Sequence, residues 1–213
     1  MSIARSLEIV DFDFDVPTDF YVIPLESDRD LDSAHWARSV VAEVFDQDAA
    51  AGAVGTIVDD LTELRRRLLA RQNPWLRALV SIRSELELTI GAIVEVQQFP
   101  MDDDDSVESY EQMVTDGLAH PAPGTRTHIA ETWRAESDAG TIVGAFHRFD
   151  IRDFGDAEGR LQQRTIFAVF PADSSDMVRF IFTVADLATF DDMIGDTQAV
   201  VETLRVKTEE SAI

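Results

Sequence analysis

Hydrophobic and polar residues alternate most regularly in the C-terminal half of the chain, where every second position shares one face in four successive stretches. A period of two with one apolar face is typical of a β-strand that covers a core. The pattern predicts strands at about 125–136, 143–151, 161–170 and 178–184. The turns between them are expected at Ser137–Gly140, Asp153–Gly159 and Pro171–Asp176, with a positive φ at Gly140. Such short connections predict antiparallel pairing.

The N-terminal half contains further strands. Alternation over Leu7–Val16 predicts a half-buried strand, which Pro17 should end because proline cannot donate to a ladder. A short apolar run follows at Phe20–Leu25. Strand character over Trp75–Phe99 predicts a hairpin with its turn near Arg83–Glu85.

Helical periods of three to four residues appear in three places before the four C-terminal strands, which form a meander. The first two helices are expected at Leu31–Phe45, capped by Asp32 or Ser33, and at about Val54–Leu69. A short third helix is expected after Asp105, which would form a capping box with Glu108.

The strongest helical period closes the chain, from Phe190 to Leu204. Thr189 is the predicted N-cap, and Arg205 and Lys207 would complement the helix dipole at its C-terminal end. Residues 209–213 are expected to fray. Together the elements predict an α+β fold with a central antiparallel β-sheet flanked by helices, in a single domain spanning 1–213.

The net charge of the chain limits the kinds of partner that it can bind. The chain carries 41 acidic and 18 basic residues, a net charge of −23, and Lys207 is its only lysine. A GC-rich genome and a salt-adapted surface both give this composition, and we favour the first because large apolar residues are not depleted. Such a surface repels phosphate backbones and anionic membranes, so we expect neither nucleic-acid nor membrane binding. A basic protein partner is the electrostatic alternative to charge that only maintains solubility.

The absence of cysteine excludes disulfides, thiolate nucleophiles and thiolate metal sites. The first 20 residues contain Asp11, Asp13, Asp15 and Asp19 and have no basic region followed by an apolar run, so we expect no signal peptide there. No stretch approaches the length of a membrane span. We therefore expect a soluble cytoplasmic protein.

The order of elements resembles the Mog1/PsbP-like family. The opening Asp13–Phe20, followed by Ile23-Pro24-Leu25, is similar to the entry strand of that family, and Val178–Val184 followed by Asp191–Arg205 is similar to its final strand and helix. The helix pair at Leu31–Leu69 departs from the family pattern. The resemblance, which extends to acidic actinobacterial proteins of unknown role, implies an α/β/α sandwich. It also implies a binding or assembly function without shared catalytic residues, since known members act on a nuclear GTPase and on a photosystem.

Histidines offer little chemistry. No pair among His35, His120, His128 and His147 has the i, i+4 spacing of a helical metal site. His128 and His147 could be neighbours on paired strands and, with Glu131, could hold zinc or a proton, or each could be a half-buried histidine hydrogen-bonded to a neighbour.

Carboxylates and arginines also gather in the sequence. Asp11, Asp13 and Asp15 lack the glycine and glutamate of an EF-hand loop, so a solvated strand face is expected there. The run Asp102–Asp105 could bind a cation only weakly. Arg65, Arg66, Arg67 and Arg71 could receive an anionic group, or could complement a helix dipole.

The sequence therefore assigns no catalytic, cofactor-binding or metal-binding residue. We expect a non-enzymatic binding or accessory protein that contacts another protein through a sheet edge or a helical face. An enzyme with a carboxylate and histidine pocket between sheet and helices is the alternative, and a structural domain with a salt-adapted surface is the third. A pocket with clustered carboxylates and a histidine would favour the enzyme, whereas an exposed apolar surface would favour the binding protein.

Overall fold

The computed structural model describes residues 7–26, 32–44, 51–83, 89–102, 105–151, 160–184 and 186–210, with side chains described from residue 54 onwards in the second helix. The described chain is a mixed α+β structure. In chain order its elements are β1 (Leu7–Asp13), β2 (Phe20–Ile23), α1 (Ser33–Val44), α2 (Ala51–Ala70), β3 (Leu76–Arg83), β4 (Thr89–Pro100), α3 (Val107–Ala119), β5 (Thr125–Ser137), β6 (Gly140–Ile151), β7 (Arg160–Phe170), β8 (Asp176–Val184), α4 (Met193–Glu202) and β9 (Arg205–Glu210).

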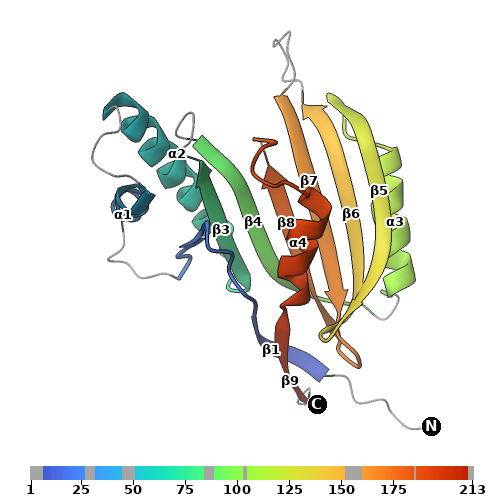
Figure 1. Cartoon of the computed structure of the whole chain (residues 1–213). Helices are drawn as coiled ribbons and strands as arrows, with labels where there is room; N and C mark the ends of the chain where they lie inside the picture. The colour runs from blue at the N-terminus through green and yellow to red at the C-terminus, as the bar shows by residue number, and fades with distance from the viewer. Residues whose placement is uncertain are drawn as a thin grey trace, which may run out of the picture.

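Seven of these strands form one antiparallel sheet in the order β2-β3-β4-β8-β7-β6-β5, and β1 pairs with β9 in a separate ribbon (Figure 1). The predicted meander from β5 to β8 is confirmed, as is the hairpin of β3 and β4. The meander enters the sheet in reverse, because its last strand, β8, pairs with β4 and leaves β5 at the edge. Sequence periodicity does not contain this long-range pairing.

Gly140 has φ 140° in the turn between β5 and β6, as expected. The conformation is needed because a Cβ at this position would lie 2.1 Å from the carbonyl oxygen of Phe170. A second glycine, Gly144, lies beneath the ring of Trp133, where a Cβ would come within 2.4 Å of the indole. The indole Nε1 donates to Oε1 of Gln198 at 2.9 Å, and this bond joins β5 to α4.

We call the side of the sheet that carries α4 and the β1/β9 ribbon the front face (Figure 1). Its centre is the largest hydrophobic cluster, in which Phe167 and Phe180 are fully buried. Ile9 and Phe12 of β1 and Val201 of α4 close this cluster from outside the sheet. Each large apolar side chain buried in this way contributes about 1.5–3 kcal/mol to folding.

The opposite side, the back face, is covered at its two ends by different helices (Figure 1). Buried side chains of α1 and α2, including Trp36 and Leu61, pack on β2 and β3. At the other end, Tyr110 of α3 packs on β6 and β7 through Val143 and Phe170. The helices therefore cover the two ends of this face and leave its centre less buried.

Several helix ends differ from the sequence expectation. Asp32 lies before α1, as predicted, and its Oδ1 accepts a hydrogen bond from the Ala34 amide. The predicted capping box of Asp105 and Glu108 is wrong, because Ser106 and Ser109 form it instead.

The largest difference between the predicted and the observed elements lies at the end of the chain. Helix α4 begins after Asp192, which replaces Thr189 as the N-cap, because its Oδ1 accepts from the Gly195 amide. The helix stops at Glu202, so Arg205 and Lys207 do not lie at a helix end. They belong to β9, which pairs with β1 and also contains the first two of the residues expected to fray.

Some predictions fall outside the described residues. These are the turn of the β3–β4 hairpin, the turn expected within 153–159, and residues 211–213. No helix in the described part of the chain is sufficiently long and apolar to cross a membrane.

Candidate functional site

A groove of about 1320 Å³ lies at the β2 end of the sheet, and we call it the edge groove. Its walls come from the segment after β1, from β2 and the residues that follow it, from the last turns of α2, and from the start of β3. Its apolar lining residues are Phe14, Val16, Val22, Ile23, Pro24, Leu25, Leu68, Leu69, Pro74, Leu76, Ala78 and Leu79.

The edge groove exists because β2 is shorter than its partner. Strand β2 pairs with Ala78–Ser81, whereas β3 begins two residues earlier, at Leu76. Pro24 follows the last residue of β2, and because proline has no N–H it cannot extend the ladder. The chain therefore leaves the sheet at Pro24, and the first two residues of β3 have no partner in β2.

Arg65 of α2 fixes the point at which the chain leaves the sheet. Its Nε donates to the Pro24 carbonyl oxygen at 2.9 Å, and its Nη1 donates to Ser33 Oγ at 2.8 Å. The residue is only 2% exposed, and burial lowers the pKa of its guanidinium. Arg65 thus acts as a buried clamp between α2 and the start of α1, and it shapes the wall of the groove.

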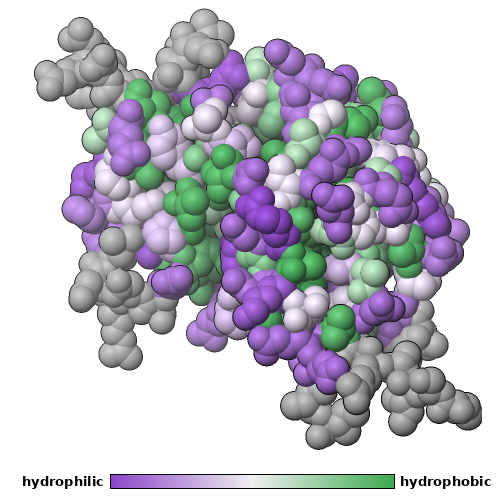
Figure 2. All heavy atoms as spheres, turned by 60° about the horizontal axis from the view of Figure 1, so that its bottom comes forward, coloured by the Kyte–Doolittle hydropathy of each residue, from purple (hydrophilic) through white to green (hydrophobic). Residues whose placement is uncertain are grey.

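Two apolar side chains in the edge groove face solvent. Val22 is 58% exposed and Val16 is 41% exposed, although most large hydrophobic residues of the described chain are buried. Figure 2, in which the bottom of Figure 1 is turned toward the viewer, shows hydrophobic side chains gathered between hydrophilic ones on that side. Exposed apolar side chains beside a groove are typical of a binding surface.

Charged residues line the outer side of the edge groove. Arg77 contacts Asp11 at 2.7 Å and Asp13 at 3.9 Å, and its guanidinium lies 4.3 Å from the centre of the Phe12 ring. Arg205 of β9 reaches Asp13 at 3.2 Å. The Arg205 hydrogen bond, supported by the Phe14 amide, lowers the pKa of the Asp13 carboxyl.

The three aspartates of the first strand region are therefore paired with arginines. Asp15 accepts from Arg205 at 2.8 Å, while Asp11 and Asp13 face Arg77. The three side chains are 65–70% exposed, so the expected solvated face is confirmed, but the sequence pattern does not predict the two arginines, which come from distant strands. The ion pairs connect β1, β3 and β9, and each of the three carboxylates already has an arginine partner.

A smaller hollow of about 410 Å³ lies where β1 meets the ends of β4 and β8. Asp176, which is 5% exposed, accepts hydrogen bonds there from the Ile9 amide at 2.7 Å and from Gln98 Nε2 at 3.1 Å. The buried carboxylate thus connects the ribbon to the sheet, and we assign it a structural role.

The two strand histidines do not meet. His128 Nε2 contacts Asp150 at 2.8 Å, whereas His147 Nε2 contacts Thr127 Oγ1 at 2.8 Å. Asp150 and His147 are three residues apart on β6, so they lie on opposite faces of the sheet. The structure therefore does not bring His128 and His147 together.

The remaining histidines are peripheral. His35 is exposed on α1, and His120 Nδ1 contacts the Asp116 carbonyl oxygen at the end of α3. Within the described ranges, no three histidine or acidic side chains are close enough to hold a metal ion. Asp103 and Asp104 of the acidic run lie outside those ranges.

The arginine cluster of α2 is dispersed. Arg65 is buried as a clamp, Arg67 contacts Glu63 on its own helix at 4.0 Å, and Arg71 forms a two-pronged contact with Glu95 of β4. Because the side chains leave the helix in different directions, they do not form one anion site. Helical spacing of 100° per residue explains this separation of consecutive arginines.

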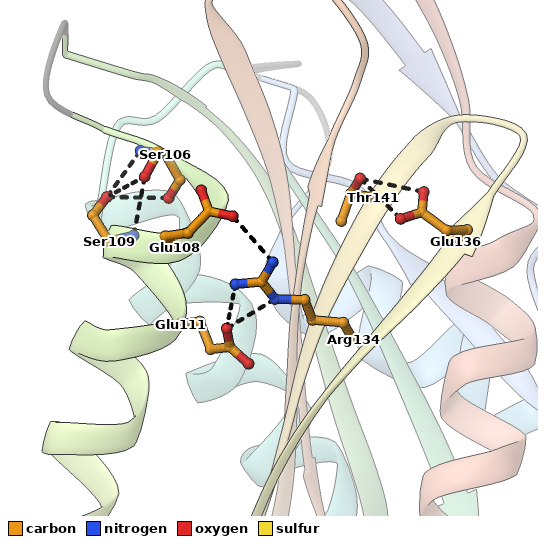
Figure 3. Close-up of polar contacts among 7 residues, drawn as sticks. All are labelled: Ser106, Glu108, Ser109, Glu111, Arg134, Glu136 and Thr141. Carbon is orange, nitrogen blue, oxygen red and sulfur yellow. Dashed lines mark hydrogen bonds and ion pairs between the residues drawn. The ribbon is translucent and has the colours of Figure 1, made fainter.

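A polar cluster docks α3 on the sheet (Figure 3). Arg134 of β5 points at α3, where its Nε donates to Glu111 at 2.8 Å and its Nη1 donates to Glu108 at 3.1 Å. These hydrogen bonds raise the pKa of Arg134, while the pKa of Glu108 is lowered first by a hydrogen bond from its own backbone amide and then by Arg134. Every charged group in this exposed cluster has a partner, so we interpret it as a structural contact.

The edge groove is thus the best candidate site, and little in the sequence points to it. The apolar run of β2 is visible in the sequence, but only the structure shows that Val22 faces outward. The chain matches no model of a known protein family and no curated protein.

Proposed function

We propose that the protein is a non-enzymatic binding protein that holds an apolar segment of a partner protein in the edge groove. The observation that carries this proposal is the combination of a 1320 Å³ groove with two exposed valines in its lining. No histidine lines the groove. Of its four charged lining residues, Arg65 is a buried clamp, Asp13 and Arg77 form ion pairs, and Glu26 is exposed. The groove therefore offers contact area more than reactive groups.

The partner segment should combine apolar side chains with basic residues. The apolar lining of the groove selects the former, and the net charge of −23 attracts the latter over a longer range. In such interfaces buried apolar anchors supply most of the affinity, while charges around the rim accelerate association.

We also propose that the fold is a Mog1/PsbP-like sandwich. Support comes from the central antiparallel sheet, from helices on both of its faces, and from an N-terminal strand outside the main sheet. Binding without shared catalytic residues is the function that this resemblance implies.

The test is affinity capture from the host extract with three forms of the protein: wild type, Val22→Asp and Met113→Asp. Val22 is 58% exposed in the groove, and Met113 is 57% exposed on α3, so the two substitutions are matched in exposure and in added charge. We expect a protein that is retained by the wild type and by Met113→Asp but lost with Val22→Asp.

The retained protein must also bind in purified form. Calorimetry should show at least about a tenfold loss of affinity for Val22→Asp, because a charge placed in an apolar contact stays desolvated and unpaired. If every captured protein binds Val22→Asp as well as it binds the wild type, the edge groove is not the binding site and the proposal is wrong.

A further inference from the structure

The centre of the back face lies between the ends that α2 and α3 cover. It carries apolar and polar side chains that are only partly buried. Ile166 of β7 and Ile181 of β8 are directly opposite each other in the register and are only partly buried. Neither belongs to any of the three hydrophobic clusters. They form an apolar floor that no described element packs against as core.

One row along the strands from this floor lies a polar row. His147 of β6, Arg164 of β7 and Thr183 of β8 are directly opposite one another, so their side chains share the back face. Arg164 Nε donates to Thr183 Oγ1 at 3.3 Å, and its guanidinium lies 5.3 Å from the centre of the Phe149 ring. These contacts hold the guanidinium over the sheet surface.

Arg164 lacks a counterion among the described residues. The charge of Glu95 raises the pKa of Arg164, but that carboxylate is already held by the two-pronged contact with Arg71. Burial lowers the pKa of Arg164, which shows that its charge is partly desolvated. In a chain with 41 acidic residues, a partly buried arginine without an ion pair is unexpected, because such a charge is costly unless paired.

His147 adds a second donor beside Arg164. Burial, and then the charge of Arg164, lower the pKa of His147, which favours the neutral form of its ring. Its Nε2 is engaged with Thr127, and within the described structure its Nδ1 has no hydrogen-bond partner. When the Thr127 hydroxyl donates to Nε2, the ring proton lies on Nδ1 and is free to be donated.

We propose that Arg164 and His147 bind the carboxylate of a small organic acid whose apolar body packs on Ile166 and Ile181. A guanidinium fork matches a carboxylate, and the neighbouring isoleucines match a hydrophobic tail. The site offers one full positive charge inside a strongly acidic protein, so a singly charged carboxylate fits better than a phosphate dianion. The site lies near the centre of the sheet and does not depend on the function proposed for the edge groove.

The experiment is a titration of the isotope-labelled protein followed by amide NMR, with benzoate as the probe. Benzamide is the neutral isostere, and inorganic phosphate is the competing anion. We expect saturable shifts at the amides of His147, Arg164 and Thr183 with benzoate and none with benzamide. Phosphate should bind more weakly than benzoate.

Arg164→Met should weaken benzoate binding at least about tenfold. Arg66→Met is the matched control, because it removes one positive charge from an exposed position on α2 and should leave the affinity unchanged. Arg164→Lys keeps the charge without the fork and should give an intermediate affinity, and it remains informative if Arg164→Met does not fold.

Four results would overturn the inference, and the first three concern benzoate and its neutral isostere. They are the absence of saturable shifts with benzoate, equal binding of benzamide, and unchanged benzoate affinity in Arg164→Met or Arg164→Lys. Tighter binding of phosphate than of benzoate would also overturn it, because it would show a general anion site.

Discussion

The two faces of the central sheet use the same strands in different ways. Along β8, Phe180 and Phe182 point to the front face and are at most 1% exposed, whereas Ile181 and Thr183 point to the back face and are only partly buried. The front face is closed by the β1/β9 ribbon and α4, which seal its cluster. On the back face the helices cover only the ends.

The two faces thus have different roles. The front face stabilises the fold, and the centre of the back face carries the proposed binding site. The closed face holds the largest of the three hydrophobic clusters, and the burial of its side chains stabilises the fold. The open centre of the back face holds a partly desolvated arginine and an apolar floor, which add little to stability. Residues that cost stability without an evident structural gain are expected at functional sites.

The largest expected effect concerns neighbouring residues of β8. Phe180→Ala should lower the free energy of unfolding by about 3–5 kcal/mol, because it leaves a cavity in the closed face. Ile181→Ala should cost much less, since its side chain is partly exposed and lies outside the clusters. Urea unfolding followed by circular dichroism measures both, and equal losses would contradict the contrast between the faces.

A second comparison uses two arginines. Arg65→Met should destabilise the protein by about 1–3 kcal/mol, because it leaves the Pro24 carbonyl and Ser33 hydroxyl without their donor. Arg164→Met should leave the stability within about 0.5 kcal/mol or raise it, because a desolvated charge without an ion pair is removed. Chemical denaturation separates the two, and a large loss for Arg164→Met would assign it a structural role.

The smallest effect is a pH dependence in the ribbon. Arg205 lowers the pKa of Asp13 in the folded protein, so this carboxyl stabilises the fold above its unfolded pKa of about 3.9. That contribution is lost as the pH falls through the lower folded value. In Asp13→Asn, urea midpoints measured between about pH 5 and pH 3 should fall less steeply than in the wild type. Identical profiles would show that the Asp13 pair does not stabilise the ribbon.

Much of the fold could be predicted because the strands and helices carry clear periods. The C-terminal error has a physical cause: β9 consists of Arg205–Glu210, five of whose six residues are polar, and only pairing with β1 makes it a strand. Local pattern cannot supply that partner. The placement of β8 beside β4 was hidden for the same reason.

The candidate sites were harder to predict than the elements. The edge groove results from the divergence of the chain at Pro24 and from the clamp of Arg65, which joins segments 41 residues apart. Arg164 is of interest because it has no counterion among the described residues. A sequence with 41 acidic residues does not reveal this. His147 was visible as a candidate, but its partners became clear only once the strand registers were known.

The most direct test of the binding role is photo-cross-linking in the host cell, with a photoreactive amino acid placed at Val22 or, as the control, at Met113. We expect a specific protein partner to be cross-linked at Val22 and not at Met113, although the two positions are equally exposed. A Val22 cross-linking pattern identical to that of Met113 would contradict the assignment of the edge groove as the partner-binding surface.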